Sequence, residues 1–167
     1  MLRCFTFLLM FVLISVPVLA ACPAERARYV ARGAPQITAG FHILPRHTSF
    51  VSDLAFYVHN AATGHTFWFG FDGGSASRVA LISTTDVTAK GWRPAEDGRP
   101  VEAVGPLGEV QYLSAGPDME FGLDVPRRGT YAPAFIVLPE FAETMWQSDF
   151  RGEDAPIGVY AFTACSK

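Results

Sequence analysis

Residues 54–71 read LAFYVHNAATGHTFWFGF, and this stretch decides the fold class. Two runs rich in aromatic and β-branched residues, 54–60 and 65–71, flank the short loop AATG, which is the pattern of a β-hairpin. Pairing the runs across this loop places six apolar side chains on one face, whereas a shift by one residue would scatter them over both faces. These residues are Leu54, Phe56, Val58, Phe67, Phe69 and Phe71. The sequence therefore predicts an antiparallel hairpin with this apolar face in the core.

The opposite face of the same hairpin carries Tyr57 and Trp68 as predicted cross-strand neighbours, with His59 on the same side. Aromatic rings with a polar edge are enriched at protein interfaces. We expect this face either to form a second buried surface or to be a partly exposed platform that binds a ligand. Tyr57, His59 and Trp68 are therefore the candidate binding residues.

The rest of the chain is divided by turn residues into short segments. Twelve prolines and 15 glycines separate segments rich in Phe, Val, Ile, Tyr and Thr, the composition of strands in a sandwich or barrel. The predicted strands are 36–44, 51–60, 65–71, 78–85, 109–114, 119–125, 132–138 and 157–164. Only residues 139–147 (PEFAETMWQ) have a helical pattern, with proline at a tolerated first position. We predict an all-β domain, a mostly antiparallel β-sandwich of about eight strands with one short helix.

The N-terminal segment has the features of an export signal. Arg3 is the only charge before Glu25, and residues 5–19 are nearly continuous apolar sequence followed by two alanines. A signal peptide has this order of features, and the apolar run is too short for a membrane anchor, which needs roughly 20 residues. We predict that residues 1–21 are a cleaved signal peptide. Residues 22–167 are then one domain that works outside the cytoplasm, in the periplasm or secreted.

The cysteines leave two alternatives for Cys22. Cys4 lies in the predicted signal, so the mature chain keeps Cys22 and Cys165, one near each end. An even number of cysteines in an exported chain is typical of a disulfide, and the termini of a domain often lie close together. However, residues 19–22 (LAAC) also match the lipobox of bacterial lipoproteins, whose cysteine sulfur is acylated. We favour the Cys22–Cys165 disulfide and keep a lipid on Cys22 as the alternative, which would be the protein's membrane attachment.

The sequence offers no recognisable catalytic, metal or cofactor motif. Residues 73–77 (GGSAS) lack the last glycine of a nucleophile elbow, which also requires a strand-turn-helix context. The four histidines, His42, His47, His59 and His65, have neither the H-E-x-x-H nor the Cys-x-x-Cys spacing of zinc sites. The predicted hairpin register sends the rings of His59 and His65 to opposite faces. We therefore assign no catalytic residue, no metal and no cofactor.

Charge and composition favour a binding function. The net charge is −3, and the largest basic cluster is Arg26, Arg28 and Arg32, which we interpret as a solvated segment near the N-terminus. Nucleic acid is an unfavourable partner because its recognition requires a basic stripe. We expect a non-catalytic binding or accessory module of the cell envelope, with a glycan, a peptide or another envelope protein as its partner. The alternative is an extracytoplasmic hydrolase or metal-dependent enzyme whose site is assembled from separate loops.

We expect the mature protein recovered from an oxidising compartment to contain no free thiol, because Cys22 and Cys165 are bonded to each other. The measurement is the intact mass after alkylation without reduction. One alkylated cysteine, together with a lipid-sized mass increase on the N-terminal peptide, would instead establish the lipoprotein alternative.

Overall fold

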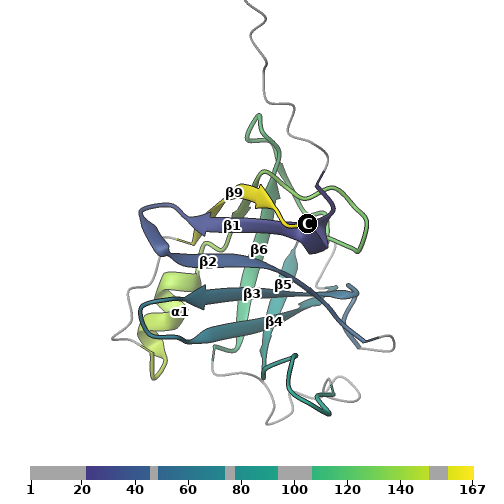
Figure 1. Ribbon diagram of the computed structural model, residues 1–167. Helices are drawn as coiled ribbons and strands as arrows, with labels where there is room; N and C mark the ends of the chain where they lie inside the picture. The colour runs from purple at the N-terminus through teal and green to yellow at the C-terminus, as the bar shows by residue number, and fades with distance from the viewer. Residues whose placement is uncertain (1–21, 46–48, 74–77, 94–106, 151–157) are drawn as a thin grey trace, which may run out of the picture.

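The computed structural model describes residues 22–45, 49–73, 78–93, 107–150 and 158–167. In this part of the chain nine strands alternate with turns, and one short helix precedes the last strand (Figure 1). The strands are β1 (Ala27–Ala31), β2 (Ala34–Ile43), β3 (Leu54–Asn60), β4 (Thr66–Asp72), β5 (Val79–Thr84), β6 (Glu109–Ala115), β7 (Phe121–Gly122), β8 (Phe135–Val137) and β9 (Val159–Cys165). The helix is α1 (Phe141–Gln147), and a single 3-10 turn, η1 (Ala24–Arg26), precedes β1.

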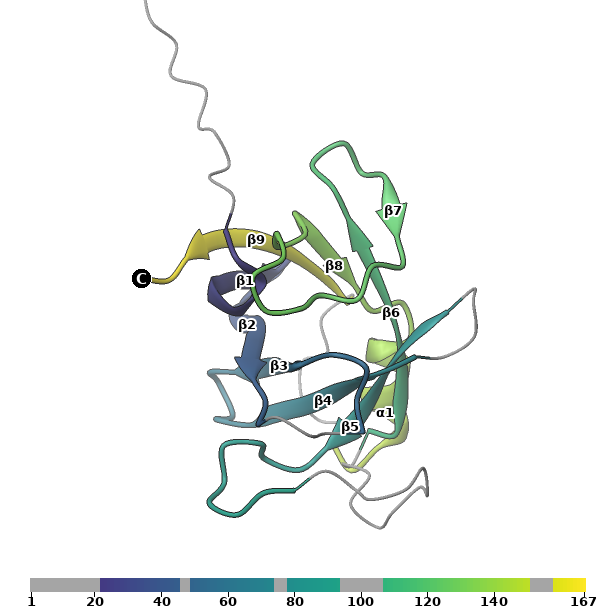
Figure 2. The ribbon, with the colours of Figure 1, turned by 90° about the vertical axis from the view of Figure 1, so that its right-hand side faces the viewer.

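The strands form one antiparallel sheet that closes on itself. Neighbours follow the order β5-β4-β3-β2-β1-β9-β8-β6, and β5 pairs back with β6, so eight strands make a barrel (Figure 2). Strand β7 pairs with the end of β6 and forms with it a hairpin that stands away from the barrel. The all-β prediction is confirmed. The sandwich prediction is wrong, because a sandwich has two separate sheets with free edges. Here a single sheet closes on itself through the pairing of β5 with β6.

Strand β1 is the element that explains this difference. The basic cluster around Arg28 is predicted to lie in a solvated segment, but Arg28 belongs to a strand that pairs with β2 on one side and with β9 on the other. Its residues Ala27, Tyr29 and Ala31 are buried, and the half-buried Arg28 and Val30 alternate with them. Two alanines and a tyrosine between arginines give a weak apolar signal, so the strand that closes the barrel is hidden in the sequence.

The hairpin of β3 and β4 has the predicted register. Phe56 pairs with Phe69, Val58 with Phe67, and each of these four side chains is buried. The six apolar residues predicted to share a face all belong to the core. This prediction is confirmed, because a local turn fixes the register of its two strands.

Other predicted elements are shorter or lie outside the described residues. The strand expected at 119–125 is reduced to Phe121–Gly122, and the helix expected at 139–147 begins at Phe141. Residues 1–21, His47 and most of the GGSAS turn are not described. Within the described residues no helix is long and apolar enough to cross a membrane.

The interior of the barrel is filled by aromatic side chains. The ring centre of Phe56 lies 6.5 Å from that of Tyr112 and 6.1 Å from that of Tyr160, and Phe71 lies 5.1 Å from Tyr112. All four side chains are fully buried. An eight-stranded barrel is just wide enough for side chains to fill it or for one small ligand. Since side chains fill this one, a ligand site belongs to an end of the barrel or to its outer surface.

The two ends of the barrel are closed differently. Helix α1 covers one end, where the ring of Phe141 lies 6.4 Å from Phe67 and 6.2 Å from Phe69. At the other end, residues 123–134 connect β7 to β8, which lie on opposite edges of β6. This connection crosses the barrel end, and we call it the strap (Figure 2).

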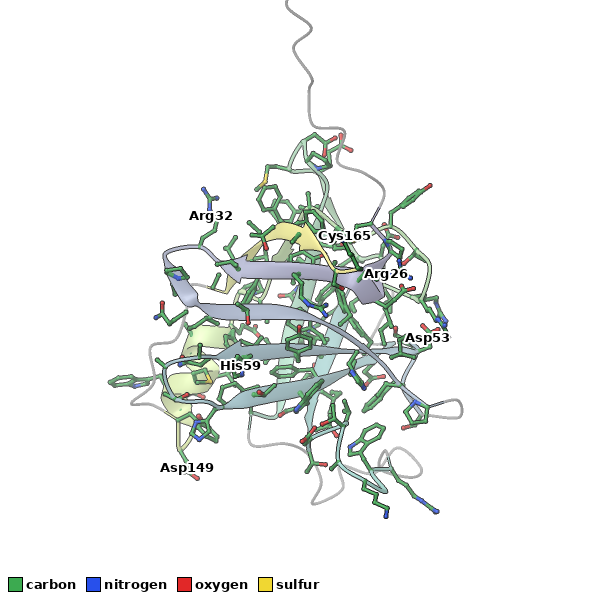
Figure 3. All side chains as sticks on the ribbon, viewed as in Figure 1. Arg26, Arg32, Asp53, His59, Asp149 and Cys165 are labelled. Carbon is green, nitrogen blue, oxygen red and sulfur yellow. A yellow bond between two sulfur atoms is a disulfide. The ribbon has the colours of Figure 1, made fainter. Side chains whose placement is uncertain are left out.

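The predicted disulfide is present and joins the two ends of the described chain. Cys22 and Cys165 are bonded, with their Cα atoms 5.7 Å apart. Beside this bond the Ser166 N–H donates to the Arg26 carbonyl at 2.8 Å, and Arg26 and Cys165 lie at the same corner of the molecule (Figure 3). The structure therefore represents the disulfide alternative for Cys22, in which its sulfur is not free for acylation.

We expect Phe69→Ala to lower the free energy of unfolding by about 3 to 5 kcal/mol, because Phe69 is fully buried between Phe56 and Phe141. Trp146→Ala is the control: this side chain is 71% exposed on α1, and its removal should change stability by about 0.5 kcal/mol or less. Chemical denaturation of the two variants measures both. Similar losses would mean that the apolar face of the hairpin is not the core.

Candidate functional site

The strap is fixed to the rim of the barrel near the start of β3. The Ser52 hydroxyl donates to the Pro126 carbonyl at 2.5 Å, and the Arg128 N–H donates to the Asp53 carboxylate at 3.0 Å. Ser52 is buried, so this contact is shielded from water. These partners are more than 70 residues apart in the chain.

The other half of the strap is fixed to the N-terminal turn. The Gly129 N–H donates to the Glu25 carboxylate at 2.9 Å, and the Ala132 N–H donates to the Cys22 carbonyl at 2.8 Å. Because Cys22 is also bonded to Cys165, this part of the strap is attached to the seam where β1 meets β9. The strap is therefore held at both halves.

A third contact reaches the strap from inside the barrel. The Tyr29 hydroxyl, on β1, donates to the Pro133 carbonyl at 2.9 Å. Burial raises the pKa of the Tyr29 hydroxyl well above its usual value, so it remains a donor at neutral pH. The core and the strap are linked through this tyrosine.

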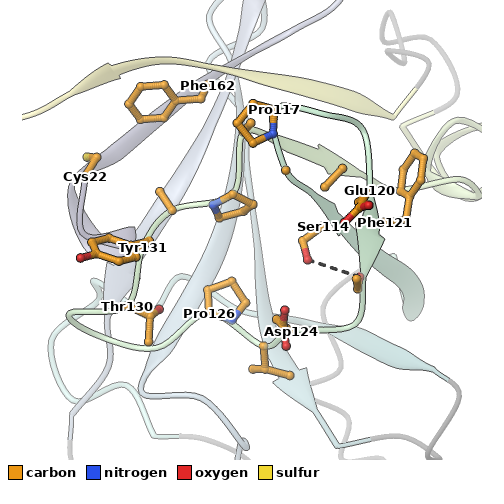
Figure 4. Close-up of a pocket in the computed structure, with 17 residues that line it drawn as sticks. Cys22, Ser114, Pro117, Glu120, Phe121, Asp124, Pro126, Thr130, Tyr131 and Phe162 are labelled. Atoms are coloured by element: carbon orange, nitrogen blue, oxygen red, sulfur yellow. Dashed lines mark hydrogen bonds between the residues drawn. The ribbon is translucent and has the colours of Figure 1, made fainter. Parts of the chain in front are cut away.

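A groove of about 790 Å³ lies between the strap and the hairpin of β6 and β7 (Figure 4). Its walls are residues 114–117, 120–122, 124–126 and 130–134, with Cys22 and Phe162. Sites for small ligands commonly have volumes of about 300 to 1,000 Å³. The groove therefore has the size of a ligand site.

The groove presents aromatic side chains to water. Tyr131 is 77% exposed and Phe121 is 56% exposed, on opposite sides of the groove (Figure 4). Phe162 lies on the same side as Tyr131. Large apolar groups that remain exposed beside a concave surface are typical of ligand or partner sites.

The polar groups of the groove are few. Its charged residues are Glu120 and Asp124, and the described residues that line it include no lysine, arginine or histidine. The Ser114 hydroxyl donates to the Gly122 carbonyl at 3.3 Å.

Tyr112 lies two residues before Ser114 on the inner face of β6. Burial raises the pKa of its hydroxyl well above the usual value, and the negative charge of Asp124 adds to this effect. The hydroxyl is therefore neutral at physiological pH. The wall of the groove at the end of β6 is therefore supported from inside the barrel by a buried, uncharged tyrosine.

The predicted platform residues lie on the outer face of the barrel. Tyr57 and Trp68 are paired across β3 and β4 with ring centres 5.4 Å apart, and both are half-buried. His59 lies on the same face (Figure 3), where its Nδ1 is 2.9 Å from the Thr66 hydroxyl. The structure thus brings the three predicted residues to one face, as the register implies. Binding by this face stays a prediction.

Part of this face is covered. The ring of Phe50 lies directly over Gly70 and leaves no room there for a Cβ atom. Ala55 is fully buried beside it, and Trp68 and Trp92 pack at the margin of the same small cluster. The face is therefore in part a second buried surface and in part a half-exposed aromatic pair.

The described histidines are dispersed. His42 lies against Trp68 with ring centres 5.7 Å apart, whereas His65 lies 5.4 Å from Phe150. In the described ranges no group of three or more His, Cys, Asp or Glu side chains is placed to hold a metal ion.

Sequence reasoning missed the groove, although one signal for it was present. Residues 116–134 are rich in glycine and proline and yet contain Phe121 and Tyr131. A turn-rich segment has little core of its own in which large aromatic side chains could be buried. Aromatic residues in such a segment therefore indicate either a contact with the domain or a binding surface.

No protein family matches this chain, and neither does any curated protein or any solved structure. The function is therefore argued from the geometry of the site.

We expect Tyr29→Phe to lower the free energy of unfolding by about 1 to 3 kcal/mol, because it leaves the Pro133 carbonyl without its donor. Tyr160→Phe is the matched control. The Tyr160 hydroxyl is buried and has no hydrogen-bond partner among the described residues, so its loss should cost nothing or stabilise. Urea denaturation measures both, and hydrogen exchange should quicken in the strap of Tyr29→Phe only. Equal effects of the two changes would contradict a role of Tyr29 in holding the strap.

Proposed function

We propose that this protein is a non-catalytic binding module of the cell envelope that holds its ligand in the groove between the strap and the hairpin of β6 and β7. One observation carries the proposal: a preformed groove with exposed aromatic side chains, Phe121 and Tyr131, on both sides. Burying such rings against a ligand is favourable by about 25 cal/mol per Å² of apolar area. The ligand would be a peptide, a glycan or a segment of another envelope protein.

The attachment of the strap supports this proposal. Hydrogen bonds to Asp53, Glu25 and Cys22 fix its backbone before any ligand arrives. A site that is already ordered loses less conformational entropy on binding, which favours affinity.

We further propose that residues 1–21 are removed as a signal peptide and that the domain works in the periplasm or outside the cell. The Cys22–Cys165 disulfide supports this location, because structural disulfides persist in oxidising compartments.

The two alternatives have less support. The Tyr57–Trp68 pair is half-exposed, but Trp68 also packs against the small cluster that includes Ala55 and Val87. A hydrolase site would require a nucleophile beside a base, and the groove residues offer the Ser114 hydroxyl already bonded to a carbonyl.

The proposal is tested by nuclear magnetic resonance on the labelled mature domain with two chemically defined probes, chitotetraose and the capped peptide Ac-Pro-Leu-Gln-Leu-Pro-NH2. We expect at least one probe to shift the backbone amides of Gly122, Thr130 and Ala132, which line the groove. Tyr131→Ala should weaken that binding about tenfold, as the loss of an aromatic anchor does.

Trp68→Ala is the matched control, because it removes an aromatic ring from the other candidate face. It should leave the dissociation constant unchanged. Shifts centred on Tyr57 and Trp68, or no shift with either probe, would contradict the groove as the binding site.

A further inference from the structure

We infer that the ligand of the groove is an apolar peptide segment that carries a lysine or arginine, with the cationic group directed at Glu120 and Asp124. This inference rests on the proposed binding function and specifies its ligand. It is carried by the distribution of charge, apolar surface and satisfied hydroxyl groups along the groove.

The two walls of the groove differ in character. Glu120 lies on the side of β7 and Asp124 at the beginning of the strap, whereas Tyr131 and Phe162 lie across the groove from Glu120 (Figure 4). A ligand that fills the groove therefore meets carboxylates on one side and aromatic rings on the other. An amphipathic segment with one cationic side chain fits this arrangement.

Among the described residues, no basic side chain neutralises the charge of the groove. No ion pair joins Glu120 or Asp124 to a basic side chain in the part of the chain that the structure describes. The nearest arginines in sequence, Arg127 and Arg128, belong to the strap but are not groove residues. Two carboxylates beside an apolar surface attract a cation and repel an anionic ligand.

The hydroxyl groups argue against a neutral glycan. Ser114 donates to Gly122, and the Thr130 hydroxyl donates to the Arg127 carbonyl at 2.7 Å and accepts from its N–H at 3.0 Å. Sugar hydroxyls that leave water need new hydrogen-bond partners, and these two side chains already have partners. The charged acceptors that line the groove are the carboxylates of Glu120 and Asp124, and a carboxylate bonds more strongly to a cationic group than to a neutral hydroxyl.

The prolines argue in the same direction. Pro117, Pro126 and Pro133 line the groove and have no backbone N–H to donate. They present flat apolar surface, which packs against aliphatic or aromatic side chains. A free polyamine would supply the charge but not the apolar groups that cover Phe121 and Tyr131.

The test uses three capped peptides that differ in one residue, Ac-Pro-Leu-Xaa-Leu-Pro-NH2 with Xaa as Lys, Gln or Glu. Binding is measured from the shifts of the Gly122, Thr130 and Ala132 amides at low ionic strength. We expect the Lys peptide to bind about three- to tenfold tighter than the Gln peptide, and the Glu peptide to bind most weakly. Raising the salt to about 0.5 M should remove most of this preference.

Two variants connect the preference to the named carboxylates. Glu120→Gln and Asp124→Asn should each reduce the ratio between the Lys and Gln peptides, and the double variant should abolish it. Glu143→Gln makes the same charge change on α1, at the other end of the barrel, and should leave the ratio unchanged. Thermal unfolding of each variant confirms that it is folded.

Failure of this inference is distinguishable from failure of the proposed function. Equal binding of the three peptides in the groove, or binding of chitotetraose in preference to them, would overturn the cationic peptide and leave the binding module standing. Spermidine binding as tightly as the Lys peptide would overturn the requirement for apolar groups. No groove shift with any of these probes would overturn both proposals.

Discussion

The pairing of β1 with β9 is the contact on which the rest of the structure depends. It joins the first and last strands, with Val30 opposite Ala161, and turns an open sheet into a barrel without free edges. Such a pairing is entropically costly because almost the whole chain lies between its partners. The Cys22–Cys165 disulfide spans a sequence separation of 143 and restricts the unfolded chain, which offsets much of that cost. The pairing of β1 with β9 and the disulfide therefore join the same two parts of the chain.

The same seam supports the candidate site. Cys22 forms the disulfide, accepts a hydrogen bond from Ala132 of the strap and lines the groove. Phe162 of β9 lines it as well, and Tyr29 of β1 holds the strap at Pro133. One side of the groove is thus built on the strands that close the barrel. The geometry of the groove consequently depends on closure of the sheet.

Contacts between residues close together in the sequence were predictable, whereas most contacts between residues far apart in the sequence were not. The hairpin of β3 and β4 was predictable because a four-residue loop fixes the partners of Phe56 and Val58. The contact between Cys22 and Cys165 was predictable because two cysteines in an exported chain are expected to form a disulfide with each other. Closure of the barrel was not predictable, because β1 directs only two alanines and Tyr29 toward the core. Its partner strand, β9, also lies far away in the sequence. The groove depends on backbone hydrogen bonds such as that from Arg128 to Asp53, for which the sequence gives no periodic signal.

The position of β7 and the strap in the topology bears on their role. Strands β6 and β8 pair directly, with Leu113 opposite Val137, so the barrel closes without the residues between them. Those residues nevertheless have a defined course, fixed by hydrogen bonds at several points of the rim. They also leave Phe121 and Tyr131 largely in water, which folding alone does not favour. A segment that strand pairing does not require, held in place and displaying aromatic rings beside a groove, supports the proposed binding function.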